Sequence, residues 1–336
     1  MDAVLDSMFE ALRRGNEVYL PSKYWEVLNR KNLDQLDAGG DDDFKRTVAL
    51  NYFTWIVRRR DDQFRNLLRR TRVRDWPAIL AGCWGGEVPP GFSRKRYAEF
   101  RIFARMLWKL ALRKDSEGLL RDLEEPAAGN PFPIRMGGKR ISQDLANSVL
   151  EYYSVREGFT VPRDRGVTVC ELGAGYGRNA YVFLSAFPRC RYVVVDIPPA
   201  LYLSQRYLSK VFPERKVFGF RPFDDYREVE QELSGADIAF LLPHQLEALP
   251  DKTFDLFLNI SSLHEMRMDQ IHAYFRLIDR LTRGFFYSKQ WLVSRIPYED
   301  ITITQDDYPV PERWKKLYQR PAEVQTAFFE AMYALG

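Results

Sequence analysis

Apolar residues recur at helical spacing through the first part of the chain. Ser22 stands just before Tyr24, Trp25 and Leu28, which predicts a helix whose first turn is capped by the serine hydroxyl. Two further stripes recur every three or four positions: Phe44, Val48, Tyr52, Trp55 and Ile56, and then Phe100, Phe103, Leu107, Leu110 and Ala111. We therefore predict an all-helical region over residues 1–130, with these stripes in its core.

Proline and glycine interrupt this pattern in residues 124–140 (EEPAAGNPFPIRMGGKR), which contain three of each. Such a segment is typical of a linker, so we place a domain boundary at residue 130. Ser142 then caps a predicted helix in which Ile141, Leu145 and Val149 share one face, and Gly158 ends this helix.

Beyond Gly158 the pattern changes to short, continuously apolar runs separated by amphipathic helices. The runs cover residues 167–172, 192–195, 238–242, 254–260 and 285–287. Strands of this kind, alternating with helices, indicate a mainly parallel sheet with helices on both faces. Residues 131–336 are therefore expected to form an α/β domain with a Rossmann-like sheet.

The first of these strands runs directly into a glycine-rich turn, in the sequence VTVCELGAGYGRNAYVF. Gly173, Gly175 and Gly177 would let the backbone adopt positive φ and let a ligand approach closely. Asp196 ends the next strand, where a carboxylate can accept two hydrogen bonds from a ribose diol. The turn alone is a weak signal, but together with this acid it indicates an adenosine-containing ligand.

Composition excludes several other classes of protein. The chain has 336 residues, of which 46% are hydrophobic and 29% charged, as expected of a folded globular protein. No apolar run of about 18 residues occurs, and acids and arginines occupy the N-terminus, so we expect a cytoplasmic protein with no membrane partner. Cys83, Cys170 and Cys190 match neither a disulfide framework nor the spacing of a zinc site.

The net charge of +4 gives little support to nucleic-acid binding. The densest basic stretch, residues 58–74, interleaves its arginines with Phe64, Leu67 and Leu68. This pattern favours an amphipathic helix with a solvated basic face over a nucleic-acid patch. We therefore expect no nucleic-acid partner.

Glu171, which precedes the glycines, separates two kinds of adenosine ligand. A carboxylate is unfavourable beside the diphosphate of a dinucleotide, but it suits a ligand that carries an ammonium group. This residue therefore favours S-adenosylmethionine over a nicotinamide cofactor.

The run from Glu171 to Gly177 resembles motif I of the class I S-adenosylmethionine-dependent methyltransferases. Asp196 matches the ribose-binding acid of that superfamily, and residues 249–266 resemble its fourth strand, whose end faces the methyl donor. The resemblance implies S-adenosylmethionine as cofactor and a class I methyltransferase sheet. It also implies a cofactor site made of Glu171, Gly173, Ala174, Gly175, Tyr176, Gly177, Asp196, Ile197, His244, Gln245, Asn259, Ile260 and Ser261.

Blocks along nearly the whole chain, among them YLPSKYWEVLN, ISQDLANSVLEYY and VVDIPPALYLSQRYLS, further resemble the bacterial sugar O-methyltransferases. This resemblance implies a sugar or glycoside as the small-molecule acceptor. The N-terminal helices would then form part of the acceptor pocket or the surface of a homodimer. One departure from the wider superfamily is that His244 and Gln245 stand where an acid often binds the adenine amino group.

His264 and Glu265 are the candidate catalytic residues. They directly follow the fourth strand, at the edge of the sheet where open α/β folds bind ligands. A sugar hydroxyl is a poor nucleophile while protonated, so a general base would accelerate in-line methyl transfer. Our hypothesis is that His264 takes the proton, while Glu265 either orients His264 or binds a substrate hydroxyl. In-line transfer does not oblige the site to hold a metal. Asp300, Asp306 and Asp307 could provide oxygen ligands for a divalent ion, but Asp306 and Asp307 stand just before Tyr308 and Pro309, a pattern typical of a turn.

Other functions stay open on the sequence alone. These are methylation of a nitrogen or of a non-sugar small molecule, nicotinamide-dependent oxidation or reduction, and cofactor binding without turnover. An amine needs less assistance from a base, so His264 fits either kind of acceptor. Glu171 disfavours the nicotinamide alternative. Arg178, after the glycines, either reaches the methionine carboxylate or is solvated.

Overall fold

The computed structural model describes residues 2–47 and 61–336. In this part of the chain the N-terminal region is helical, as predicted. Its α-helices are α1 (Ala3–Arg14), α2 (Lys23–Gly39), α3 (Phe44–Thr47), α4 (Asp62–Arg70), α5 (Trp76–Leu80) and α6 (Arg94–Lys114). In the stripe predicted to begin at Phe44, four residues lie outside the described residues: Val48, Tyr52, Trp55 and Ile56. The start of the basic stretch, at Arg58, also lies outside them.

Local sequence accounts for the described helices of this region. Ser22 caps α2 by accepting a hydrogen bond from the backbone N–H of Trp25, as predicted. The stripe from Phe100 to Ala111 is buried along α6. Helix α4 buries Phe64 and Leu67 and leaves most of its arginines exposed, which confirms the amphipathic interpretation for this part of the basic stretch.

The C-terminal part contains an eight-stranded sheet in the order β11-β12-β8-β7-β3-β4-β6-β5. Six neighbouring strands pair in parallel, and β12 and β11 add an antiparallel edge. The strands are β3 (Val167–Leu172), β4 (Cys190–Val195), β5 (Val217–Phe218), β6 (Ile238–Leu241), β7 (Phe254–Ile260), β8 (Thr282–Trp291), β11 (Lys315–Pro321) and β12 (Phe328–Ala334). The predicted α/β, Rossmann-like fold class is confirmed.

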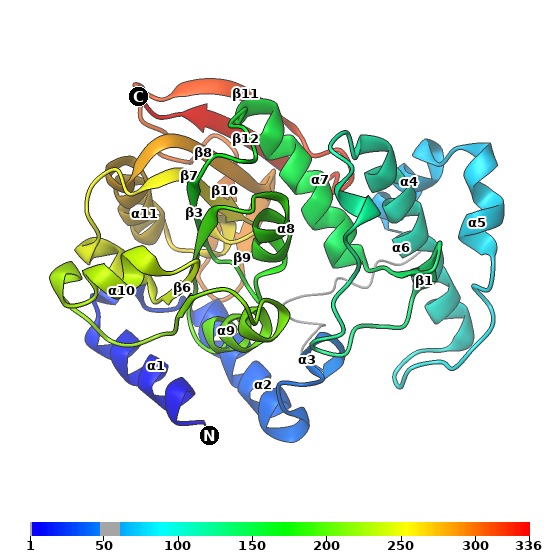
Figure 1. Cartoon of the computed structure of the whole chain (residues 1–336), viewed down its shortest axis with the longest axis horizontal. Coiled ribbons are helices and arrows are strands. Elements are labelled where there is room, and N and C mark those ends of the chain that lie inside the picture. The colour runs from blue at the N-terminus through cyan, green and yellow to red at the C-terminus, as the bar shows by residue number, and fades with distance from the viewer. Residues whose placement is uncertain (1, 48–60) are drawn as a thin grey trace.

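Helices cover both faces of the sheet. Alternate residues of each buried strand point to opposite sides and therefore belong to two different cores. On β3, Val169 belongs to the core shared with α7 (Gln143–Gly158), α8 (Arg178–Ala186) and α9 (Ala200–Val211). Cys170 belongs to the core beneath α10 (Glu230–Gly235) and α11 (Met268–Leu281). In Figure 1 the helices α4–α6 lie beside α7, whereas α1 and α2 lie below the sheet near α9. None of the described helices is long and apolar enough to cross a membrane.

The predicted linker folds onto the body of the protein and contains a short hairpin of β1 (Arg135–Met136) and β2 (Lys139–Arg140). Glu125 in this segment is buried, where it pairs with Lys45 of α3 and accepts a hydrogen bond from Ser142. The apolar residues of α6 and α7 belong to one core cluster. The helical region and the sheet are therefore packed together on both sides of the predicted boundary.

Candidate active site

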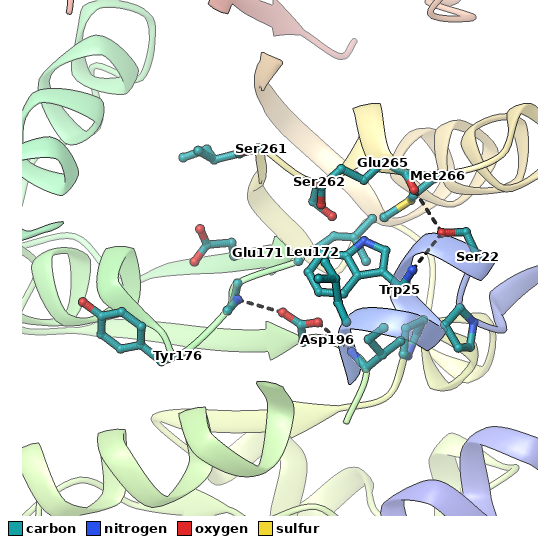
Figure 2. A pocket seen from close by; sticks show the side chains of 18 of the residues that line it. Ser22, Trp25, Glu171, Leu172, Tyr176, Asp196, Ser261, Ser262, Glu265 and Met266 are labelled. Carbon is teal, nitrogen blue, oxygen red and sulfur yellow. Dashed lines mark hydrogen bonds between the residues drawn. The ribbon is translucent and has the colours of Figure 1, made fainter. Parts of the chain in front are cut away.

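A cavity of about 310 Å³ opens at the carboxyl ends of β3, β4 and β7. Parallel sheets present their ligand sites at this edge, because the connecting turns leave a crevice there. The first turns of α7 and α8 and the short 3₁₀ turn η6 (Leu263–Glu265) complete its inner wall. Residues 19–28, from the N-terminal region, form the opposite wall, and Figure 2 shows Trp25 of α2 and Asp196 among the residues that line the same cavity.

The glycine turn has the backbone that its sequence predicts. Gly173, Gly175 and Gly177 have φ values of 71°, 59° and 88°, in the left-handed region that favours glycine. A Cβ on Gly173 would lie 2.2 Å from the Oγ of Ser262. The turn therefore brings bare backbone to the cavity, where Gly173, Ala174, Gly175 and Tyr176 all contribute to the lining.

Asp196 lies at the end of β4 with its carboxylate at the cavity. Its two oxygens accept hydrogen bonds of 2.7 Å from the backbone N–H groups of Gly175 and Ile197, the first of which is drawn in Figure 2. Burial raises the pKa of Asp196 to about 7, although these two donors oppose the shift. The second lone pair of each oxygen leaves capacity to accept further hydrogen bonds.

Glu171 lies beside the glycine turn and is buried. Its carboxylate accepts hydrogen bonds from Asn179 (2.8 Å) and Tyr192 (2.7 Å), which fix its position at the cavity. Burial raises the pKa of Glu171 to about 7. A positively charged group in the cavity would favour the ionised form of this carboxyl group.

Helices α7 and α8 meet at a buried group of charges. Arg178 donates to Glu151 (2.5 Å) and Ser148 (2.8 Å), and Lys289 of β8 donates to the second oxygen of Glu151 (2.8 Å). The two cations hold the pKa of Glu151 at about 2 despite its burial. Arg178, which the sequence left between two roles, lines the cavity and is paired with Glu151.

The start of α7 adds polar groups to this end of the cavity. Asp144 accepts a hydrogen bond from the hydroxyl of Tyr176, at 3.0 Å, and burial raises its pKa to about 6. Gln143 is buried, and its Oε1 has no hydrogen-bond partner among the described residues. A buried amide oxygen without a partner is costly, so a ligand that donates a hydrogen bond here would stabilise it.

Glu265 lines the cavity at the end of η6. Its backbone oxygen accepts a hydrogen bond from the Ser22 hydroxyl (3.2 Å), and its carboxyl group accepts one from Trp25. Burial raises the pKa of Glu265 to about 8, and nearby Asp196 adds to the shift. The carboxyl group is thus mostly protonated at pH 7 and reaches balance between its two protonation states near pH 8.

His264 lies behind the cavity wall and is not among the residues that line it. Its Nδ1 is 2.9 Å from Oε1 of Gln290, and its ring packs against Trp291 and Phe328. Its Nε2 is 3.8 Å from the carboxyl group of Glu265. Burial lowers the pKa of His264 to about 4, so the ring is neutral at physiological pH.

Four of the predicted cofactor-binding residues also lie outside the residues that line the cavity. Asn259 is fully buried and joins the ends of two strands, by donating to Leu172 O (2.8 Å) and accepting from Leu263 N (3.1 Å). Gly177 faces Leu208. Gln245 caps its own turn, with both ends of its amide bonded to backbone, and His244 packs against Gly15.

Nine predicted cofactor residues therefore converge on one cavity, together with Glu265. The nine are Glu171, Gly173, Ala174, Gly175, Tyr176, Asp196, Ile197, Ile260 and Ser261. The sequence did not identify Glu151 and Asp144 as site residues, although both belong to the block ISQDLANSVLEYY, because this block lies on a helix before the glycine turn and its pattern indicates only a capped helix. The sequence indicated only that the N-terminal helices form part of the acceptor pocket or a homodimer surface. It did not identify Trp25 as a contact of Glu265.

Metal ligands are not apparent in the described part of the chain, where no group of three or more histidine, cysteine, aspartate or glutamate side chains is placed to hold an ion. Asp307 instead accepts hydrogen bonds from the N–H and hydroxyl of Thr304, as in an ordinary turn.

No protein-family model matches the sequence, and no curated protein matches it either. The resemblance to sugar O-methyltransferases therefore stays a prediction. Among solved structures, the protein is similar to mitomycin 7-O-methyltransferase, with 13% identity and a TM-score of 0.37 over 83% of this chain and 70% of that chain.

Two further similar structures each cover slightly more than half of this chain. The 1,6-didemethyltoxoflavin-N1-methyltransferase of Burkholderia thailandensis, solved with S-adenosylhomocysteine, has 14% identity and a TM-score of 0.34 over 57% of this chain and 78% of that chain. The PH0226 protein of Pyrococcus horikoshii has 15% identity and a TM-score of 0.37 over 55% and 92%.

Proposed function

We propose that this protein is an S-adenosylmethionine-dependent methyltransferase that methylates a hydroxyl group of a small molecule, such as a sugar or glycoside. The observation that carries the proposal is the convergence of the Gly173 turn, Asp196 and Glu171 on one cavity at the carboxyl edge of the sheet. Glycine permits close approach of a ligand, and the carboxylate at the end of the second strand suits a ribose diol.

The residues present suit this cofactor. Asp196 retains acceptor capacity for the ribose hydroxyls, and the unpartnered Oε1 of Gln143 can accept from the methionine ammonium group. Arg178 is the candidate for the methionine carboxylate, since its side chain lines the same end of the cavity. When bound, the cofactor supplies a methyl group activated by the positive charge on sulfur.

The charges of the cavity support a cationic cofactor over a dinucleotide. Among the described residues, five carboxylic side chains line the cavity, and the single arginine is paired with one of them; the carboxylic residues are Asp144, Glu151, Glu171, Asp196 and Glu265. Burial raises the pKa of four of the five, so a cation would be stabilised here and a diphosphate repelled.

Glu265 is the better placed of the two candidate bases. It lines the cavity, whereas His264 lies behind it, so we assign proton removal from the acceptor hydroxyl to Glu265. A base works best with a pKa near the working pH, and that of Glu265 is about 8. His264, neutral and held by Gln290, supports the turn that carries Glu265.

The walls around Glu265 suit a ring-shaped acceptor. Tyr24 and Phe328 line the cavity together with Leu28, and aromatic side chains pack well on the faces of sugar rings. A second candidate is methylation of an amine, because the carboxyl-rich cavity would also attract a protonated amine. Phosphorylated acceptors are disfavoured, because the same carboxyl groups would repel a phosphate.

Calorimetric titration with S-adenosylhomocysteine and with NAD tests the cofactor assignment. We expect the wild-type protein to bind the first and not the second, and Asp196→Ala to weaken binding at least tenfold, because the ribose contact is lost. Asp164→Ala, an exposed aspartate in the loop before β3, is the matched control and should bind normally. Binding of NAD alone, or of neither compound, would exclude the proposed function.

A further inference from the structure

The start of helix α2 makes two separate contacts with the residue proposed as the base. Ser22 Oγ donates to the backbone oxygen of Glu265 at 3.2 Å, and Trp25 donates to its carboxyl group. Figure 2 shows Ser22 bridging the backbone of Trp25 and Glu265, with the Trp25 ring between Glu265 and Asp196. A segment more than two hundred residues away in the sequence thus fixes both the turn and the side chain of Glu265.

The ionisable groups around Glu265 explain why the contact from Trp25 matters. Asp196, from the end of β4, disfavours the ionised form of Glu265. Tyr24, from α2, and His264, from the same turn, are both neutral at physiological pH: burial raises the pKa of Tyr24 to about 12 and lowers that of His264 to about 4. Among the described residues, the N–H of Trp25 is therefore the donor that favours the carboxylate.

We propose that Trp25 is a positioning residue of the active site, which holds the Glu265 carboxyl group toward the cavity and stabilises its ionised, proton-accepting form. This inference rests on the proposed function, in which Glu265 removes the acceptor proton. It assigns to the N-terminal helical region a direct part in the chemistry of the sheet. The helix would not merely cover the cofactor, because its removal would also change the proton affinity of the base.

The indole N–H of Trp25 reports on Glu265 without any acceptor. The protein has seven tryptophans, so the NMR spectrum of indole-labelled protein contains few indole N–H signals. The Trp25→Phe variant identifies the signal that belongs to Trp25. We expect the chemical shift of this signal to change with pH in one step with a midpoint near 8. The Glu265→Gln variant should show no such step. The Trp84→Phe variant, which changes an exposed tryptophan in the loop after α5, should leave the titration unchanged.

Bound ligands then relate this titration to the methyl donor. With S-adenosylmethionine the midpoint should lie at lower pH than with S-adenosylhomocysteine, because only the former carries a positive charge on sulfur. A Trp25 signal with no step between pH 6 and 10, or with a step that persists in Glu265→Gln, would overturn the inference. Absence of binding by both ligands, with the step intact, would instead overturn the proposed function and with it the role of Glu265 as a base, while the contact of Trp25 with Glu265 would stand.

Discussion

Gly173 is the residue of the turn that packs directly against Ser262, just after the end of β7. Its φ of 71° is strained for any residue with a side chain, and the space that a Cβ would need is filled by Ser262. Backbone conformation and available space therefore both require glycine at this position. Ser262 in turn lies beside Ser261, which itself has a φ of 60° and lines the cavity.

A Gly173→Ala variant should therefore lose stability and cofactor affinity together. We expect the free energy of unfolding to fall by more than about 1 kcal/mol, because alanine is unfavourable at positive φ. Urea denaturation measures this loss, and calorimetry with S-adenosylhomocysteine measures the affinity. Gly235→Ala, at the exposed end of α10 where a Cβ meets no atom within 4 Å, is the control. Adding Ser262→Gly should restore part of the loss, and no loss at all in Gly173→Ala would contradict this account.

At the scale of elements, helix α7 connects the helical region to the edge of the sheet. One side of it packs against α6, and its first turn supplies Gln143 and Asp144 to the cavity. Glu151, two turns later, holds Arg178 of α8 and Lys289 of β8 at once. A buried lysine and a partly buried arginine share one carboxylate, so α7, α8 and β8 are tied together by a single side chain.

Replacing Glu151 by glutamine should leave two cations close together without a compensating charge. We expect Glu151→Gln to lower the free energy of unfolding by about 3 kcal/mol, the usual cost of breaking a buried ion pair. Glu157→Gln, on the same helix, is the matched control because Glu157 is half exposed in its pair with Arg320. That change should cost less than about 1 kcal/mol. Equal urea midpoints for the two variants would show that the buried group contributes no net stability.

At the scale of the whole molecule, the cavity concentrates acidic groups that the folded chain holds partly protonated. Burial raises the pKa of Glu171 and Asp196 to about 7 and that of Glu265 to about 8. A raised carboxyl pKa means that the folded state binds more protons than the unfolded state, so stability falls as pH increases through this range. His264, with a lowered pKa, acts in the opposite direction, but only below pH about 6.5.

The ligand-free protein should therefore melt at progressively lower temperature as the pH is raised from 6.5 to 8.5. Calorimetric scans of the wild type and of Glu265→Gln measure this dependence. The variant should show the shallower decline, because it lacks one of the three groups that lose protons in this window. A Tm that is constant or rises over the same range would contradict the assignment of these carboxyl groups.

Local and periodic features of the fold could be predicted from the sequence. The strands at 167–172 and 254–260, the Ser22 and Ser142 caps and the end of α7 at Gly158 all depend on residues adjacent in the chain, and all are confirmed. The strand ends also placed the glycine turn, Asp196 and Glu265 at one edge, because parallel strands share their carboxyl ends.

Contacts between distant segments required the tertiary structure. The sequence favoured His264 as the base and gave Glu265 an orienting or substrate-binding role. Only packing shows that Glu265 lines the cavity while Gln290 holds His264 behind it. The same holds for Gln245, whose amide bonds to backbone 24 residues away at Arg221.

The sequence by itself thus determined the sheet, its edge and the glycine-rich turn, because strand periodicity and glycine conformation are local properties. Only the tertiary structure decided which acidic groups are buried, how α2 meets Glu265, and which side chains face the cavity. Burial and pairing depend on segments far apart in the chain, and they set the pKa values on which the chemistry of the site depends.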